Sequence, residues 1–391
     1  MEVCPLFDFL IIGLGPAGST LARLLSEKSG LRVAAIDRKH IPDSDCDSLP
    51  HQFDKPCGGL LAPDAQKVLA SFHLTLPSEI LVSPQIFSVH TIDLDTGKSR
   101  YYQRFYLNLS RRLFDEWLIS LIPESVTLFR GFTCSSIEQI DGIFHVTITD
   151  SDDSSIKQTL QARYIIGADG ANSFVRRTFF PKFHGRSYVS IQQWFAAEKP
   201  LFSPGSPSPL PKSPAPYYSC IFDSKITDCY SWSVSKDGFL IFGGAYPAKN
   251  CRRHFELQKQ KLAAHGFDLS APLHTEACQV LRPASPSHFC TGKNGVFLIG
   301  EAAGFVSPSS LEGISSALES ARLLAHILRD RLSDSPQRLA AAYSRATLPL
   351  RIKLLLKLLK CPFMYQPFLR RLVMASGLQS IKMEHQTDKN I

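Results

Sequence analysis

Three short motifs combine glycine with small or acidic residues, and they are spread over three quarters of the chain. Their sequences are Gly-Leu-Gly-Pro-Ala-Gly at residues 13–18, Gly-Ala-Asp-Gly at 167–170 and Gly-Glu-Ala-Ala-Gly at 300–304. Glycine lets a phosphate approach the backbone, and a carboxylate at the end of a strand can accept hydrogen bonds from a sugar hydroxyl. The set predicts one long nucleotide ligand that is bound at several points.

The first motif lies between an apolar run at residues 8–12 and a predicted helix at 19–29. Gly13 would permit the tight turn, Gly15 the close approach of a pyrophosphate, and Gly18 the packing of helix against strand. The helix N-terminus adds N–H groups and a positive dipole. A glycine-rich turn without a ligand is the alternative. The predicted phosphate-binding residues are Gly13, Gly15, Pro16, Ala17 and Gly18.

A carboxylate follows the next predicted strand, which covers residues 31–36. Asp37 stands about 20 residues after the glycines, where an acid accepts hydrogen bonds from ribose hydroxyls. Its neighbour Arg38 completes this part of the predicted site. The order of strand, helix and strand predicts a parallel βαβ unit.

The second and third motifs each place an acid directly after a short apolar strand. Asp169 could bind a ligand hydroxyl, or it could cap a helix. Glu301 is followed by small residues, and Gly304 and Pro308 belong to the segment predicted to lie against a flat ring. The helix that begins near Gly313 could direct N–H groups at an oxygen that becomes anionic on reduction, or it could be an ordinary capped helix. Three such motifs in this order indicate FAD rather than NAD.

The chain resembles the p-hydroxybenzoate-hydroxylase-type FAD fold and, within it, the geranylgeranyl reductase family, particularly the bacterial CbrA-like group. The resemblance rests on the three motifs with Asp37, on Lys-Pro-Cys-Gly-Gly at 55–59, and on Arg-x-x-Phe-Asp-x-Trp-Leu, which begins at Arg111. It covers roughly residues 5–330. It implies FAD as cofactor and, in some members, reduction of carbon–carbon double bonds.

The resemblance also implies roles for single residues. Arg111 would reach the pyrophosphate, and Glu301, which replaces a commoner aspartate, would contact the ribityl chain or the pyrophosphate. Cys134 would offer backbone groups to the adenine, with a core cysteine as the alternative. Gly313 and Ile314 would face the flavin pyrimidine.

Cys57 and Gly58 would lie against the isoalloxazine ring, and the Pro-Cys-Gly-Gly segment is typical of reductase-like members. A thiol beside a reduced flavin could donate the proton that completes alkene reduction. The alternative is a small side chain that packs on the ring. Cys57 is therefore the predicted catalytic residue.

The substrate-domain motif of the family, Tyr-x-Trp-x-Phe-Pro, is altered in this chain. Tyr230 and Trp232 are present and are predicted to line the substrate pocket, but Val234 and Ser235 replace the Phe-Pro pair. The change alters the pocket wall and weakens the inference of a prenyl substrate.

We expect an α/β protein, α+β overall, with a Rossmann-like FAD-binding domain, an inserted antiparallel β-sheet substrate domain and a helical C-terminal tail. The discontinuous FAD-binding domain is predicted to comprise residues 1–75, 105–185 and 278–332. The sheet-rich substrate domain would comprise 76–104 and 186–277, and the basic helical region 333–391. Proline- and serine-rich residues 202–216 and polar residues 41–52 are predicted loops.

The net charge of +8 is concentrated near the C-terminus. Residues 343–383 hold eight Lys or Arg and no Asp or Glu, and the rest is near neutral, so a nucleic-acid partner is not expected. In 348–360, Leu348, Ile352, Leu355, Leu356 and Leu359 are predicted to share one face of a helix opposite Lys353, Lys357 and Lys360. That helix would either contact an anionic membrane or dock on the main domain with its lysines in water.

The composition indicates a monomer without a metal site that is cytoplasmic, or peripheral to the inner face of the membrane. The leading hypothesis is an FAD-dependent oxidoreductase that reduces carbon–carbon double bonds of a small hydrophobic, prenyl- or lipid-like substrate. The alternatives are a flavin-dependent aromatic monooxygenase and a flavin-binding redox sensor or membrane-recruited protein without turnover. The electron donor stays open between NAD(P)H, ferredoxin and quinone.

Overall fold

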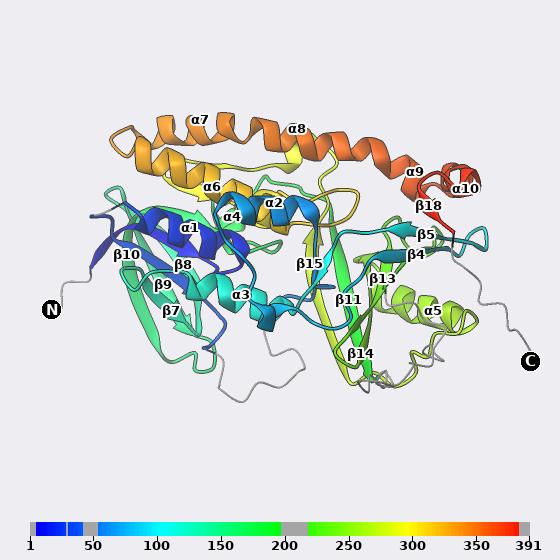
Figure 1. Cartoon of the computed structure of the whole chain (residues 1–391). Helices are drawn as coiled ribbons and strands as arrows, with labels where there is room; N and C mark the ends of the chain where they lie inside the picture. The colour runs from blue at the N-terminus through cyan, green and yellow to red at the C-terminus, as the bar shows by residue number, and fades with distance from the viewer. Residues whose placement is uncertain (1–4, 29, 42–53, 197–217, 383–391) are drawn as a thin grey trace, which may run out of the picture.

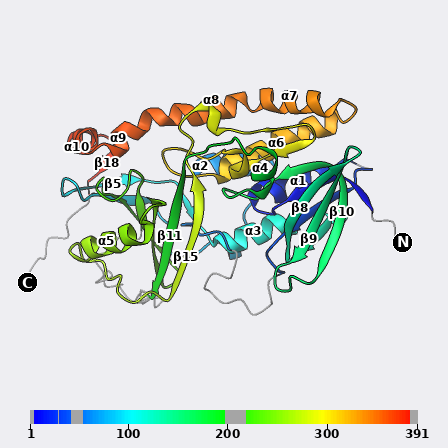
Figure 2. The same ribbon diagram turned by 180° about the vertical axis from the view of Figure 1, so that it is seen from behind.

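A computed structural model places two large β-sheets next to each other and a line of C-terminal helices across one edge of both (Figures 1 and 2). The structure describes residues 5–28, 30–41, 54–196 and 218–382. The predicted loop at 202–216 and all but the first residue of the one at 41–52 lie outside the described residues.

The first sheet has a mainly parallel core in the order β16-β17-β10-β1-β2-β7. The central strands β1 and β2 are apolar and mostly buried, as parallel strands covered on both sides must be. An antiparallel extension, β8 and β9, pairs with β10. The strands are β1 (Leu6–Ile12), β2 (Val33–Asp37), β7 (Thr127–Arg130), β8 (Phe132–Ile140), β9 (Ile143–Asp150), β10 (Lys157–Gly167), β16 (Gly292–Lys293) and β17 (Val296–Leu298).

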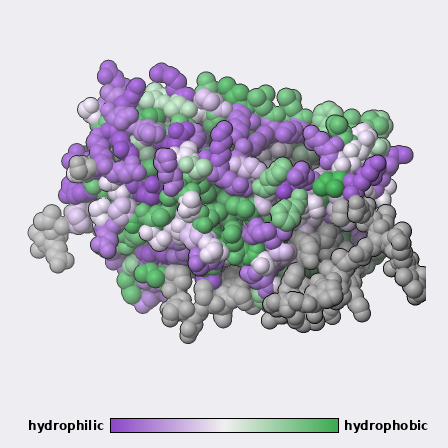
Figure 3. All heavy atoms as spheres, viewed as in Figure 1, coloured by the Kyte–Doolittle hydropathy of each residue, from purple (hydrophilic) through white to green (hydrophobic). Residues whose placement is uncertain are grey.

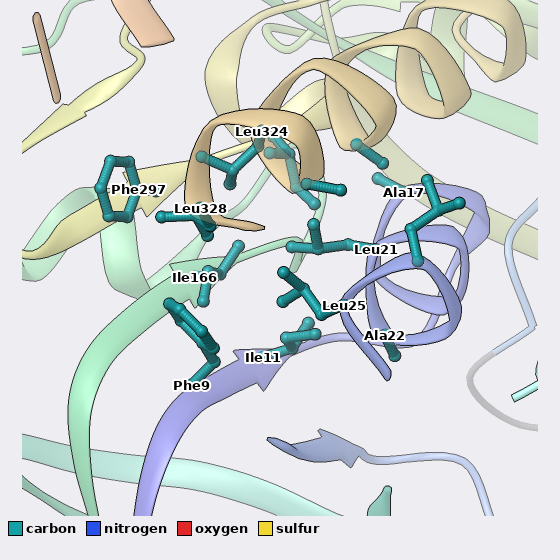
Figure 4. Close-up of a cluster of buried hydrophobic side chains, with 14 of the residues drawn as sticks. Phe9, Ile11, Ala17, Leu21, Ala22, Leu25, Ile166, Phe297, Leu324 and Leu328 are labelled. Carbon is teal, nitrogen blue, oxygen red and sulfur yellow. The ribbon is translucent and has the colours of Figure 1, made fainter. Parts of the chain in front are cut away.

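Helices α1 (Pro16–Ser26) and α6 (Ile314–Asp330) cover one face of this sheet. Figure 4 shows Leu21 and Leu25 of α1 meeting Leu324 of α6 above the strands. Helix α1 begins three residues earlier than predicted, because proline suits the first helical position and glycine precedes it.

The second sheet has the order β15-β11-β14-β13-β12-β4-β5-β18, and the amphipathic helix α5 (Cys251–Ala263) packs on it. β11 and β15 were not predicted as separate strands. The strands are β4 (Ser88–Asp93), β5 (Lys98–Gln103), β11 (Ser187–Ala196), β12 (Tyr218–Phe222), β13 (Ser231–Lys236), β14 (Phe239–Pro247), β15 (His274–Leu281) and β18 (Ser380–Ile381).

Short elements connect the two sheets. They are α2 (Pro63–Ser71), α3 (Arg111–Ser120), α4 (Phe174–Phe179), the strand pair β3 (Leu60–Leu61) and β6 (Leu107–Asn108), and 3₁₀ turns at Ser78–Ile80, Pro286–His288 and Gly300–Ala303. The predicted fold class is confirmed: a Rossmann-like unit, a mainly antiparallel sheet and a helical C-terminal region. The predicted domain limits stay predictions.

The C-terminal helices run from the first sheet to the second (Figure 1). They comprise α7 (Pro336–Ala346), α8 (Leu348–Leu356), the 3₁₀ turn η4 (Lys357–Lys360), α9 (Cys361–Tyr365) and α10 (Pro367–Ser376). Leu339 and Tyr343 of α7 pack into the hydrophobic core that α1 and α6 form on the first sheet. At the other end, β18 pairs with β5 of the second sheet. The region is therefore part of the fold.

The side through which the 348–360 helix docks is neither the predicted apolar face nor the predicted lysine face. The helix docks through Leu350 and Leu354, which belong to the core of the first sheet, and Lys353 and Lys357 form ion pairs with Asp64 of α2. Apolar residues occupy more than one face of this helix, so helical periodicity alone did not determine which face is buried.

A buried ion cluster joins α10 to the β4–β5 hairpin. Arg370 donates to Asp93 Oδ1 at 2.8 Å and to Asp95 Oδ2 at 2.6 Å, and all three side chains are buried. Burial raises the pKa of Asp93, but hydrogen bonds from Arg370 and Thr96 outweigh it and hold that pKa below its ordinary value. This cluster ties the end of the chain to the second sheet.

We predict that Arg370→Ala lowers the free energy of unfolding by about 3–5 kcal/mol, because it leaves two buried carboxylates without their counter-charge. Urea denaturation measures the loss. The exposed neighbour provides a matched control, Arg371→Ala, which should change stability by less than about 0.5 kcal/mol. Equal effects of the two substitutions would contradict the role of the cluster.

The cluster also predicts a pH dependence. Because the folded-state pKa of Asp93 is lowered, the stability that this pairing contributes is present above the ordinary pKa and is lost as the pH falls through the folded-state pKa. The gap between wild type and Arg370→Ala should therefore narrow as the pH falls below the ordinary Asp93 value of 3.8, because the paired carboxylate of the folded protein then takes up its proton. A gap that widens in acid would contradict this.

Candidate FAD-binding site

Strand register brings the three motifs to one edge of the first sheet. β1, β10 and β17 are parallel neighbours, and Gly167 lies opposite Ile12 on one side and Leu298 on the other. Each motif follows its strand at the carboxyl end, where ligands of open α/β sheets bind. The motifs therefore begin at the same level, although they are far apart in sequence.

The motifs touch each other closely, and glycine makes this contact feasible. A Cβ atom on Gly13, whose φ is +102°, would lie 2.6 Å from the carbonyl oxygen of Ala168, and one on Gly18 would lie 1.8 Å from that of Gly13. A Cβ atom on Gly300 would approach the Cβ of Ala17 to 3.0 Å. Larger side chains at these positions would separate the motifs.

The N-terminus of α1 fits a pyrophosphate. Pro16 and Ala17 form its first turn, and no side chain of the described residues caps it. A Cβ atom on Gly15 would meet nothing within 4 Å, so there is open space directly in front of the helix. Free N–H groups beside open space are what an anionic phosphate requires.

Asp37 has a structural role in addition to the predicted one. Its Oδ2 accepts from the backbone N–H of Leu14 at 2.6 Å, and its Oδ1 accepts from that of Lys39 at 2.9 Å. The carboxylate thus fixes the glycine turn. Arg38 is exposed at the end of β2. Contacts of Asp37 and Arg38 with a ribose stay predictions.

Asp169 caps a helix with one of its two carboxylate oxygens, whereas its contact with a ligand hydroxyl stays a prediction. Its Oδ2 accepts from the N–H groups of Phe174 and Val175 and so caps α4. Its Oδ1 is buried without a partner among the described residues. Burial raises the pKa of Asp169, although hydrogen bonds from Ser173 and the α4 backbone oppose this. The free oxygen beside the first motif fits a hydroxyl group of the cofactor.

Glu301 connects three segments of the site. Its Oε2 lies 3.0 Å from Nζ of Lys55, and its Oε1 accepts from the N–H of Leu281 at 3.0 Å. Burial alone would lower the pKa of Lys55, but the Glu301 charge raises it. Lys55 belonged to a motif in the sequence but was not identified as a partner. The predicted contact of Glu301 with the cofactor stays a prediction.

The residues that follow Glu301, up to Pro308, are tightly packed. Gly304 has a φ of +83°, and a Cβ atom there would lie 2.2 Å from the carbonyl oxygen of His288. The carbonyl of Pro308 accepts from Arg282.

Helix α6 follows that segment. Its N-terminus carries a side-chain cap, which is one of the two alternatives that the sequence left open. Glu312 accepts hydrogen bonds from both the N–H and the hydroxyl of Ser315, so the capped-helix alternative holds for one N–H group. The side chain of Ile314 packs in a core with Leu61. Contacts of Gly313 and Ile314 with the flavin pyrimidine stay predictions.

Cys57 lies where the two sheets approach each other. Its Sγ accepts a hydrogen bond from the N–H of Gly59 at 3.4 Å, and the guanidinium of Arg111 lies within hydrogen-bonding reach of the thiol. A Cβ atom on Gly58 would stand 3.4 Å from Nε1 of Trp232, a buried donor without a partner among the described residues. The thiol, a cation and a tryptophan from β13 are thus close together.

Arg111 belongs to a buried charge network. Its Nε donates to Asp115 Oδ1 at 2.9 Å, and Oδ2 of the same carboxylate lies 3.5 Å from Nζ of Lys39. Burial would lower the pKa of Arg111, but Asp115 and the Cys57 sulfur raise it. The i, i+4 spacing of Arg111 and Asp115 could have indicated this pair. The predicted reach of Arg111 to the pyrophosphate stays a prediction.

Lys236, at the end of β13, anchors the segment behind Cys57. Its ammonium donates to the carbonyls of Gly59 and Leu109 and to Oδ1 of Asn108. Burial lowers the pKa of Lys236 to about 7, and the charges of Cys57 and Asp237 oppose that shift. The sequence showed Lys236 only as the residue after the altered motif.

Tyr230 and Trp232 lie next to each other on or beside β13, with ring centroids 5.9 Å apart. The Tyr230 hydroxyl donates to the carbonyl of Ser310 at 2.7 Å and so joins the second sheet to the loop that follows the third motif. Cys134 lies in the hydrophobic core at a bulge in β8, and burial raises the pKa of its thiol to about 12. Its side chain is thus a core cysteine, whereas its backbone role toward adenine stays a prediction.

Comparison with known proteins agrees with this geometry. Residues 124–228 match a family model described as FAD binding domain. The chain is 48% identical over 375 residues to Protein CbrA of Escherichia coli O6:H1, covering 96% of this chain and 94% of that protein. Protein CbrA of Shigella sonnei is also 48% identical, with 98% of its length covered. This chain belongs to the CbrA family.

Solved structures extend the likeness to the fold of this CbrA-family chain. A geranylgeranyl bacteriochlorophyll reductase-like protein from Thermoplasma acidophilum gives a TM-score of 0.72 at 18% identity, covering 94% of this chain and 90% of that one. PqsL, a probable FAD-dependent monooxygenase from Pseudomonas aeruginosa, gives 0.64 at 16% identity, covering 95% and 100%. The cofactor of this CbrA-family chain is FAD.

The geometry predicts different outcomes for two similar substitutions. Gly15→Ala should leave the thermal unfolding of the apoprotein unchanged but weaken FAD binding by roughly tenfold or more, because the methyl group enters the phosphate space. Gly18→Ala should destabilise the apoprotein itself, because its Cβ clashes with the Gly13 carbonyl. Calorimetry and FAD titration of the apoprotein measure both effects. Unchanged FAD affinity in Gly15→Ala would contradict the phosphate site.

Proposed function

We propose that this chain is a reductase that saturates a carbon–carbon double bond in a hydrophobic, prenyl- or lipid-like substrate. The observation that carries the proposal is the position of Cys57, with the Arg111 guanidinium beside its thiol and Trp232 next to the adjoining glycine. The likeness of the fold to a geranylgeranyl bacteriochlorophyll reductase-like protein supports it.

Cys57 is suited to supply the proton of such a reduction. Reduced FAD, when bound, supplies a hydride to one carbon of the double bond, and the second carbon needs a proton. The thiol of Cys57 donates that proton from Sγ, which leaves a thiolate. The fixed positive charge of Arg111, held in place by Asp115, stabilises the thiolate until a proton returns from solvent.

The environment of Cys57 suits an apolar substrate. Leu60, just after the Cys57 segment, packs against a buried cluster on the second sheet that includes Ile86, Val89 and Trp232. The Nε1 of Trp232, which has no partner within the described part of the chain, can donate to a single polar group of a substrate that is otherwise apolar. Tyr230 and Trp232 are the proposed pocket residues on this sheet.

A flavin-dependent aromatic monooxygenase is the second candidate, and the likeness of the fold to PqsL favours it. The two reactions differ in their need for oxygen. A reductase oxidises its photoreduced flavin with an unsaturated lipid under anaerobic conditions, whereas a monooxygenase needs both oxygen and an aromatic substrate. Anaerobic reoxidation by prenyl lipids, compared with oxygen uptake in the presence of aromatics, separates them.

We predict that Cys57→Ala lowers the rate at which an unsaturated lipid reoxidises the photoreduced enzyme by about 10²-fold or more, because general acid catalysis typically contributes that much. FAD content, measured by absorbance, should stay unchanged. Cys251→Ala, on α5 and outside the described site, is the matched control and should keep the wild-type rate. Reoxidation of Cys57→Ala at the wild-type rate would show that the thiol only packs against its surroundings.

A further inference from the structure

An apolar stripe stays exposed along the C-terminal helices. Leu348, Ile352, Leu356, Leu359 and Phe363 recur at helical spacing through α8, η4 and α9, and each is between 47% and 69% exposed. Figure 3 shows hydrophobic surface gathered along the edge over α8 and toward α9, whereas the edge over α7 is hydrophilic. Such a patch on a folded surface marks an interaction site.

Lysines accompany the stripe on one side. Lys353, Lys357 and Lys360 each follow an exposed apolar residue of the stripe by one position. A hollow of about 530 Å³ is lined by apolar residues of α8 together with these three lysines. We call the stripe and the three lysines the C-terminal face.

The net charge of this face is positive. Residues 343–382 contain no Asp or Glu, and Asp64 of α2 balances only one of the two lysines that it contacts. Lys360 and, on α10, Arg371 are exposed and have no ion pair among the described residues. A second copy of the chain, docked by two-fold symmetry on the same face, would bring lysine against lysine. The face therefore complements an anionic surface.

We infer that the C-terminal face binds the surface of a bilayer that contains anionic phospholipid. Its apolar side chains would enter the boundary between headgroups and acyl chains while the lysines contact lipid phosphates, as interfacial helices do. Contact would be peripheral, because within the described residues no helix combines the length and the apolar character that crossing a bilayer requires.

The inner side of the same helices contacts the candidate site. The Tyr365 hydroxyl of α9 donates to the carbonyl of Ser309 at 2.6 Å, and Cys361 Sγ donates to that of Pro308. Binding to a bilayer would thus hold the loop that follows the third motif near the lipid phase. This consequence, unlike the binding itself, rests on the proposed function.

Co-sedimentation of the FAD-loaded full chain with vesicles tests the inference. Wild type should bind vesicles of phosphatidylglycerol and phosphatidylcholine, bind pure phosphatidylcholine much more weakly, and lose affinity as salt is raised. The triple variant Ile352→Asn, Leu356→Asn, Leu359→Asn should bind about tenfold or more weakly, because three apolar side chains no longer favour insertion.

Matched controls separate the face from general effects. Ile156→Asn, Leu257→Asn, Leu273→Asn makes the same change at exposed positions elsewhere and should bind as wild type does. Lys360→Glu should weaken binding to anionic vesicles, and the exposed Lys249→Glu should weaken it less. Retained FAD and an unchanged melting temperature show that each variant is folded.

Three outcomes would overturn the inference. They are failure of wild type to bind anionic vesicles, equal binding to pure phosphatidylcholine, and unchanged binding by the folded triple variant. Sedimentation without lipid could give a fourth such outcome. If wild type forms dimers and the triple variant does not, the face is a site of self-association. None of these measurements uses substrate, so failure here and failure of the proposed reaction are distinguishable.

Discussion

Close backbone approach at the carboxyl edge of the first sheet is the constraint on which the rest of the structure depends. The parallel register of β1, β10 and β17 brings three turns to one level, and side chains at Gly13 or Gly18 would force these turns apart. Asp37 then holds the first turn by accepting from Leu14. The space in front of α1 exists only because all these contacts are made together, so the fold and the cofactor site have one origin.

Charged side chains around Cys57 hold its segment against the carboxyl edge of the first sheet. Lys55 pairs with Glu301, Arg111 with Asp115, and Lys236 donates to backbone carbonyls and Asn108. Each cation would be costly to bury without its partner. Because the network joins Lys236 of the second sheet, helix α3 and the turn after β17 of the first sheet, it fixes how the two sheets meet. Cys57 thus lies at a junction whose geometry no single element determines.

The C-terminal helices close this junction from outside. Leu350 and Leu354 pack on the first sheet, whereas Arg370 reaches into the hairpin of the second. The same helices therefore bridge both sheets and contact the loop after the third motif through Tyr365. Their outward apolar residues lie outside the buried hydrophobic clusters of the described residues, which is why their exposure calls for a separate explanation.

The sequence by itself determined the parallel βαβ unit, the order of the motifs, FAD as cofactor and the presence of a second, sheet-rich part. These follow from local signals: apolar runs, glycine spacing and an acid after a strand. Only the tertiary structure decided that Asp169 caps α4 with one oxygen, that Lys236 anchors Gly59, and that Leu350 and Leu354 form the docked side of α8. Those contacts join residues far apart in the chain, and local periodicity carries no information about distant partners.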